Sequence, residues 1–115
     1  MKIIYGIKNC NTVKKVLTYL DEHAIPYTFH DYKKAGITKD RLESWCRQAG
    51  WEALVNKKGT TWRQLDDTVK EGVTDAASAI ALMAAHTSVI KRPVIEEQDK
   101  ILSIGWNEEA LQQLK

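Results

Sequence analysis

Cys10 is the residue of this sequence whose surroundings best suit chemistry. It lies where a short strand is predicted to give way to a helix, so the N–H groups of the first helical turn point toward its sulfur. Such a position favours an anion, and a thiolate held there has a lowered pKa and reacts as a nucleophile. Further donors and positive charges lie close to it in the sequence: Lys8, Asn9, Asn11, Thr12, Lys14 and Lys15. The alternative role for Cys10 is that of a small residue that fills a tight turn.

The second cysteine, Cys46, has a different setting. It belongs to an apolar stripe at helical spacing with Leu42, Trp45 and Ala49. Because a buried cysteine behaves as a small hydrophobic residue, the stripe predicts a structural role. The alternative is a resolving role in which Cys46 closes a disulfide with Cys10, and this requires Cα atoms within about 7 Å of each other.

Arg92 and Pro93 stand at the start of a predicted strand, a place where proline is tolerated. If this segment lies beside Cys10, the planar guanidinium can hold an oxyanion or a carboxylate through a fork of donors that lysine does not provide. Arg92 is therefore the second candidate for a catalytic residue. The alternative is a surface arginine next to a turn proline.

The composition is that of an ordinary globular protein. With 115 residues, 43% of them apolar and 28% charged, the chain is expected to form a single domain over residues 1–115. No run of about 18 apolar residues is present, and we expect a cytoplasmic protein without a membrane segment. The net charge of +2 is too small to indicate direct nucleic-acid binding. No metal site is expected, because the three histidines lack the spacing of metal ligands: His23, His30 and His86.

The elements expected to position Cys10 form a β-α-β unit. Residues 2–5 are predicted to be a strand and residues 11–23 an amphipathic helix. The helix ends before Pro26, because the residue before a proline avoids the α region. Tyr27 to Tyr32 alternates as a half-buried strand does.

Between this unit and the last third of the chain, residues 36–88 are interpreted as a helical insertion. Thr38 is predicted to cap a helix that stops at Gly50. Thr74 is predicted to cap an alanine-rich helix over residues 75–85.

The last third returns to strands at residues 94–96 and 101–104, separated by the polar loop 97–100. Asn107 then caps a final helix. The resulting order is β-α-β, helices, β-β-α, which predicts an α/β fold with a mixed sheet.

Four segments of the sequence, residues 4–15, 59–65, 74–79 and 90–95, resemble the arsenate-reductase-related (ArsC) family and within it the Spx/YffB branch. The resemblance covers almost the whole chain in the same order. It implies a thioredoxin-like core with a helical insertion.

The resemblance also implies roles for particular residues. A nucleophilic cysteine before the first helix and a cis proline after an arginine match Cys10, Pro93 and Arg92. Arsenate reductases of the family use this cysteine to attack arsenate, and glutathione completes the reduction. For this chain the first hypothesis is glutathione-dependent thiol/disulfide exchange, with glutathione as co-substrate, no bound cofactor, and a disulfide or oxyanion as substrate. Cys10 and Arg92 are then the catalytic residues. The expected residues for binding substrate or glutathione are Lys8, Asn9, Asn11, Thr12, Lys14 and Pro93.

Two departures from the family pattern shape the alternatives. Arsenate reductases of this family carry two more anion-binding arginines, and the matching segments 53–58 and 101–105 contain none. Because a tetrahedral oxyanion needs several charge-assisted donors, arsenate reduction is only the third hypothesis. The second is a regulator similar to Spx that binds a protein partner, RNA polymerase, without turnover. Spx regulators that sense oxidation have a Cys-x-x-Cys pair, and Val13 takes the second position here, which excludes that internal switch.

Overall fold

The computed structural model describes residues 1–114, and Lys115, the last residue of the expected range 1–115, lies outside them. The chain divides into two compact units. The first combines Met1–Ala35 with Arg92–Lys115, and the second is Gly36–Lys91. Within residues 1–114, no helix combines the length and the apolar character needed to cross a lipid bilayer.

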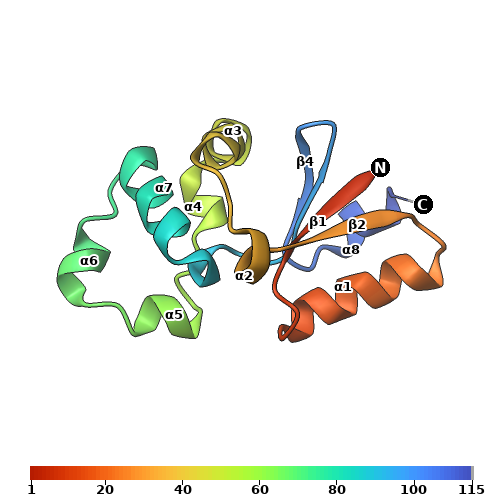
Figure 1. The fold of residues 1–115 in the computed structure, drawn as a ribbon, viewed down its shortest axis with the longest axis horizontal. Coiled ribbons are helices and arrows are strands. Elements are labelled where there is room, and N and C mark those ends of the chain that lie inside the picture. The colour runs from red at the N-terminus through yellow and green to blue at the C-terminus, as the bar shows by residue number, and fades with distance from the viewer. Residues whose placement is uncertain (115) are drawn as a thin grey trace. The chain divides into compact units, whose positions relative to one another are not determined.

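A four-stranded mixed sheet forms the centre of the first unit (Figure 1). Its strands are β1 (Lys2–Gly6), β2 (Tyr27–Asp31), β3 (Val94–Glu97) and β4 (Lys100–Ile104), in the order β2-β1-β3-β4. β1 pairs with β2 in parallel and with β3 antiparallel, and β3 pairs antiparallel with β4. The predicted α/β fold and mixed sheet are therefore confirmed.

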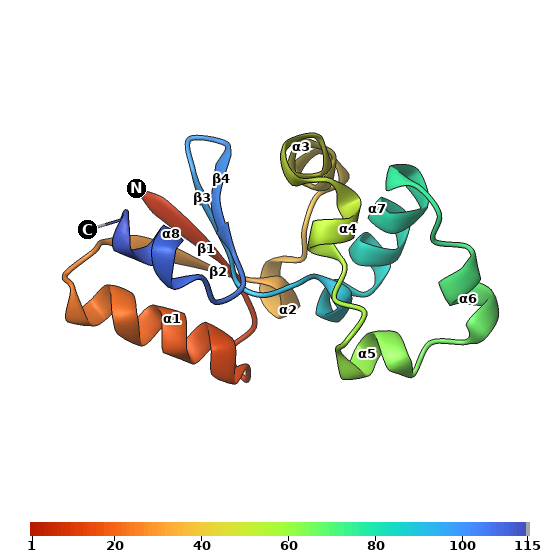
Figure 2. The same cartoon turned by 180° about the vertical axis from the view of Figure 1, so that it is seen from behind.

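One face of this sheet is covered by two helices, α1 (Asn11–Glu22) and α8 (Glu108–Gln112). Figures 1 and 2 show both helices on the same side of the strands. The apolar stripe predicted for the first helix faces this core, because α1 buries Val13, Val16 and Leu20. The core cluster contains Ile4, Val16, Leu20, Ile25, Ile95 and Leu111. Asn107 caps α8 as predicted, its side chain accepting a hydrogen bond from the N–H of Ala110 at 3.1 Å.

Two strand boundaries differ from the prediction. The loop of the hairpin is shorter than residues 97–100, because Gln98 and Asp99 have positive φ angles of 51° and 65°. Two such residues match the twist of paired strands and let Glu97 and Lys100 pair across the ladder. Tyr32 is not the end of β2 but the first residue of the short helix α2 (Tyr32–Ala35).

The second unit is built from helices. They are α3 (Lys39–Ala49), α4 (Trp51–Leu54), α5 (Thr60–Arg63), α6 (Asp67–Glu71), α7 (Ala76–Ala85) and the 3₁₀ helix η1 (Thr87–Val89). Thr38 caps α3 as predicted, since its hydroxyl accepts a hydrogen bond from the N–H of Arg41 at 3.2 Å. Gly50 ends α3 with a positive φ of 84°.

Two expectations for these helices are wrong in detail. The cap of α7 is Asp75 and not Thr74, because the Asp75 carboxylate accepts the N–H of Ser78 at 2.9 Å and the Ser78 hydroxyl accepts the N–H of Asp75 at 3.1 Å. This reciprocal capping box satisfies two donors of the helix start. In α3, Leu42 and Trp45 are buried as predicted, but Ala49 in the last turn is exposed.

Candidate functional site

Cys10 occupies the position that the sequence predicts for it, directly before α1. It is the N-cap residue, with extended backbone at φ −126° and ψ 121°, and its free thiol is half-buried. No full capping hydrogen bond reaches its side chain. The amides of the first turn therefore act on the sulfur as nearby dipoles aimed at the start of the helix.

Several groups act on the ionisation of this thiol. Burial raises the pKa of Cys10, but the backbone N–H of Val13, the N–H groups and charge of Arg92, and the backbone N–H of Thr12 lower it by more. The pKa of Cys10 is therefore below its ordinary value. Electropositive surroundings of this kind make a cysteine reactive.

Gly6 lets the end of β1 come close to the start of α1. A Cβ atom at this position would lie only 2.9 Å from Cγ2 of Val13, which is closer than carbon atoms approach each other. The buried side chain of Val13 thus lies directly against the strand end that leads to Cys10. Glycine at residue 6 positions the thiol by allowing this approach.

Arg92 begins the second segment of the same unit and precedes β3. It is partly buried, and its peptide bond to Pro93 is cis, as the family resemblance implies. Its effect on the Cys10 pKa combines hydrogen bonding with positive charge. The structure thus brings together Cys10 and Arg92, which are 82 positions apart in the chain.

The other predicted binding residues lie close to Cys10 in the chain or, in the case of Pro93, next to Arg92. Four of them are exposed side chains next to Cys10 in the chain: Lys8, Asn9, Asn11 and Lys14. Thr12 is partly buried and acts through its backbone N–H, while Pro93 is buried. Lys15 lies over the ring of Trp106, with its ammonium nitrogen 4.1 Å from the ring centroid. The positive charge that lowers the pKa of Cys10 belongs to Arg92.

A group of buried and half-buried polar residues includes Arg92, and its other members were not predicted as part of the site. We call it the polar cluster: Tyr5, His30, Tyr32, Arg92 and Glu96. The Tyr5 hydroxyl donates a hydrogen bond of 2.9 Å to Oε1 of Glu96, whose residue is only 1% exposed. The ring of Tyr5 lies 4.7 Å from that of His30 and 6.3 Å from that of Tyr32, measured between centroids.

The pKa of Tyr32 depends on two charged members of the polar cluster, Arg92 and Glu96. Burial raises the pKa of its phenol strongly, Tyr5 and Glu96 raise it further, and Arg92 lowers it. Its hydroxyl is buried and has no hydrogen-bond partner among the described residues. A sequence signal for the polar cluster did exist, because Glu96 alternates with the apolar Ile95 in a strand and so shares a face with Val94.

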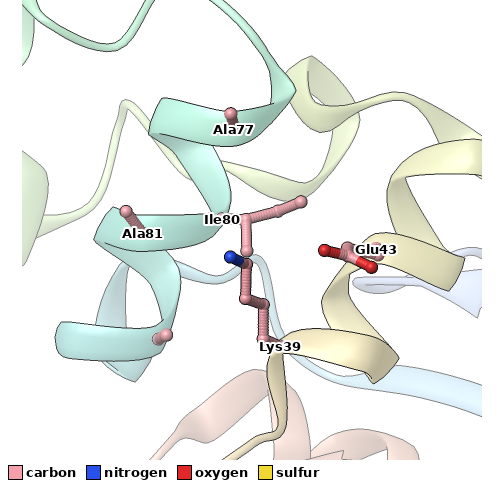
Figure 3. A pocket seen from close by; sticks show the side chains of 6 residues that line it. Lys39, Glu43, Ala77, Ile80 and Ala81 are labelled. Atoms are coloured by element: carbon pink, nitrogen blue, oxygen red, sulfur yellow. The ribbon is translucent and has the colours of Figure 1, made fainter.

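Cys46 has the opposite electrostatic setting to Cys10. It is half-buried on α3 in the second unit, and burial raises the pKa of its thiol. A cavity of about 370 Å³ lies between α3 and α7 of this unit (Figure 3). Its lining is mostly apolar, with Lys39 and Glu43 contributed by α3 and Ile80 by α7. The cavity contains neither cysteine and none of the predicted site residues.

Over residues 1–114, no group of three or more histidine, cysteine, aspartate or glutamate side chains is placed to hold a metal ion.

Comparisons with known proteins show the family and the fold of the chain. The model of the ArsC family matches residues 5–114. The solved structure of the YffB protein superimposes with a TM-score of 0.92 at 44% identity, covering 99% of this chain and 98% of that one. An arsenate reductase (ArsC) related protein from Brucella melitensis has a TM-score of 0.77 at 44% identity, covering 97% and 92% of the two chains. The global transcriptional regulator Spx 2 of Bacillus cereus is 26% identical over 96% of this chain and 84% of that protein.

Proposed function

The chain belongs to the ArsC family, and from that premise we propose that it is a glutathione-dependent thiol/disulfide oxidoreductase with Cys10 as its nucleophile. The observation that carries the proposal is the position of Cys10 directly before α1, where amides of the first turn and Arg92 lower the pKa of its thiol. A cysteine that merely filled a turn would need neither. The similarity to a Brucella protein described as arsenate reductase (ArsC) related supports a redox role.

The proposed reaction has two exchange steps. The Cys10 thiolate attacks the glutathione sulfur of a mixed disulfide, forms a new S–S bond and releases the substrate as a thiolate. A glutathione thiolate then attacks the Cys10 mixed disulfide, which releases oxidised glutathione and regenerates the Cys10 thiolate. Two electrons reach the substrate disulfide, and the glutathione pool supplies them. A low thiol pKa raises the fraction of enzyme that can attack, and it also makes Cys10 a better leaving group in the second step.

Each predicted binding residue has a place in this scheme. Arg92 and the amides of Val13 and Thr12 hold the thiolate, and Arg92 also offers donors to a glutathione carboxylate. We propose that the exposed side chains next to the thiol contact glutathione and that Pro93 shapes the groove. These exposed side chains are Lys8, Asn9, Asn11 and Lys14.

A pair of cysteine variants tests the proposal. We expect Cys10→Ser to abolish glutathione-dependent reduction of a glutathionylated peptide, while circular dichroism shows an intact fold. The reduction is measured through coupling to glutathione reductase. Cys46→Ser is the matched control, and it retains activity because its thiol lacks the features that lower the pKa. Normal turnover by Cys10→Ser would end the proposal.

A second function is favoured by the similarity to the Spx 2 regulator. Here the chain binds a protein partner, RNA polymerase, and does not turn over. A pull-down with separate polymerase subunits, combined with the reductase assay, distinguishes the regulator from the oxidoreductase. The regulator is favoured if Cys10→Ser retains a subunit and the unmodified protein has no reductase activity. Arsenate reduction is the third candidate, and we expect no arsenate-dependent oxidation of glutathione because segments 53–58 and 101–105 lack arginine.

A further inference from the structure

We propose that Glu96 is a positioning residue which, together with its hydrogen-bond partner Tyr5, holds the guanidinium of Arg92 at the Cys10 sulfur. The inference deepens the proposed function and rests on it. It assigns a task to a buried carboxylate that the exchange reaction itself does not use.

The argument begins with the burial of Glu96. The residue is 1% exposed, and a charged side chain is almost never buried to this extent without compensation. The Tyr5 hydroxyl supplies one hydrogen bond, at 2.9 Å to Oε1. A carboxylate offers about four acceptor sites, so Glu96 can accept hydrogen bonds from other donors in addition to the Tyr5 hydroxyl.

The strand pairing explains how these two side chains meet. Tyr5 of β1 lies directly opposite Val94 of β3 in the antiparallel register, and Glu96 is two residues further along β3. Ile4 and Ile95, the neighbouring pair, point into the core beneath α1 and α8. Tyr5 and Glu96 therefore occupy the face of the sheet that these two helices do not cover.

Arg92 and Glu96 both lie within electrostatic range of the Tyr32 phenol. The charges of both residues act on the Tyr32 phenol with opposite sign, and the Tyr32 ring stacks near that of Tyr5. Arg92 acts on Cys10 as well. The polar cluster thus extends from Tyr5 and Glu96 in the sheet to Arg92 at the thiol.

The cluster has a physical reason to order the arginine. A guanidinium is charged at every accessible pH and carries a flexible stem, so holding it at one atom costs conformational entropy. A buried carboxylate on a rigid strand offers a planar partner that limits this freedom before any substrate binds. We therefore assign Glu96 to the orientation of Arg92 and not to contact with substrate.

The test is the pH profile of the Cys10 reaction with a pyridyl disulfide, measured in a Cys46→Ser background. Glu96→Gln keeps the shape of the side chain and removes its charge. If the carboxylate acted on the sulfur only through space, its loss would favour the thiolate and move the profile to lower pH. Positioning predicts the opposite: the midpoint moves to higher pH and the reaction below the midpoint slows by about twofold.

A double-mutant cycle shows whether Glu96 acts through Arg92. In an Arg92→Gln background, Glu96→Gln should no longer move the profile to higher pH, because the residue to be positioned is gone. Glu97→Gln is the matched control, since Glu97 lies next in the strand and its carboxylate pairs with Lys2 at 3.5 Å. We expect it to leave the profile unchanged.

An unchanged or lowered midpoint in Glu96→Gln would overturn the inference, and so would an equal upward shift with and without Arg92. If Glu96→Gln does not fold, as judged by circular dichroism, Tyr5→Phe decides by the same criteria, because it keeps the buried ring and removes only the donor. The profile reports on the sulfur without turnover. A protein that proves inactive as a reductase would therefore refute the proposed function and still give a clear result here.

Discussion

Replacing Arg92 by glutamine removes the charged side chain that lowers the pKa of the Cys10 thiol. Burial then opposes ionisation with only the amides of Val13 and Thr12 against it. A hydrogen bond to a charged group contributes about 1.5–3 kcal/mol in a sheltered site. Because Cys10 is half-buried and solvent screens the pair, about 1 kcal/mol is the appropriate figure. This corresponds to about a fivefold lower ratio of thiolate to thiol at a given pH below the midpoint.

The reaction rate changes by less than the thiolate fraction, and in a way that depends on pH. A thiolate with a higher pKa is intrinsically more nucleophilic, with a Brønsted coefficient of about 0.45. Below the midpoint, the Arg92→Gln variant should therefore react with a pyridyl disulfide about 2.5-fold more slowly. Above it, where both thiols are ionised, the variant should react about twofold faster. The two profiles cross, and the crossing is the expected signature.

The assay follows release of the pyridine thione by absorbance in a Cys46→Ser background, so that only Cys10 reacts. Lys91→Gln is the matched control, because it removes an exposed positive charge from the neighbouring residue and should leave the profile unchanged. Arg92→Lys keeps the charge and loses the planar fork, so its profile should fall between the other two. Profiles of Arg92→Gln and the unmodified thiol that coincide at every pH would refute the assignment of Arg92 to the thiolate.

Three further predictions concern stability. The folded-state pKa of Tyr32 lies far above its unfolded value of about 10. The contribution of the neutral phenol to stability is therefore complete below about pH 10 and is lost as the pH rises above it. Tyr32→Phe should reduce this alkaline destabilisation, as measured by thermal unfolding across pH. Asp75→Ala should lower the free energy of unfolding in urea by about 1 kcal/mol, because the capping box with Ser78 is lost. Gly6→Ala should lower the melting temperature, with a cost of about 1–3 kcal/mol, because its Cβ would lie 2.9 Å from Val13.

The sequence by itself determined what depends on neighbours along the chain. The helical spacing of Val13, Val16 and Leu20 predicted the buried face of α1. Thr38 and Asn107 predicted the N-caps of two further helices. The same local reasoning placed Cys10 at the start of α1. These features need only the geometry of a helical turn, in which every partner lies within a few residues.

Local signals were weaker where two residues could do the same task. Thr74 and Asp75 are both residue types that cap helices well. Asp75 is the cap of α7 because its backbone is extended and it exchanges hydrogen bonds with Ser78. Neither residue of the turn, Gln98 or Asp99, is the glycine that marks a tight turn in a sequence. Both nevertheless adopt positive φ angles because the twist of the paired strands requires it.

Only the tertiary structure decided the electrostatics of the site. The hydrogen bond between Tyr5 and Glu96 joins residues 91 positions apart, and it exists because the register of β1 with β3 brings their side chains to one face. The sequence named Arg92 as a candidate on the condition that it lies near Cys10, and the fold meets that condition. The strength of a charge interaction depends on distance and burial, and both are set by the packing of segments that local patterns do not relate to each other.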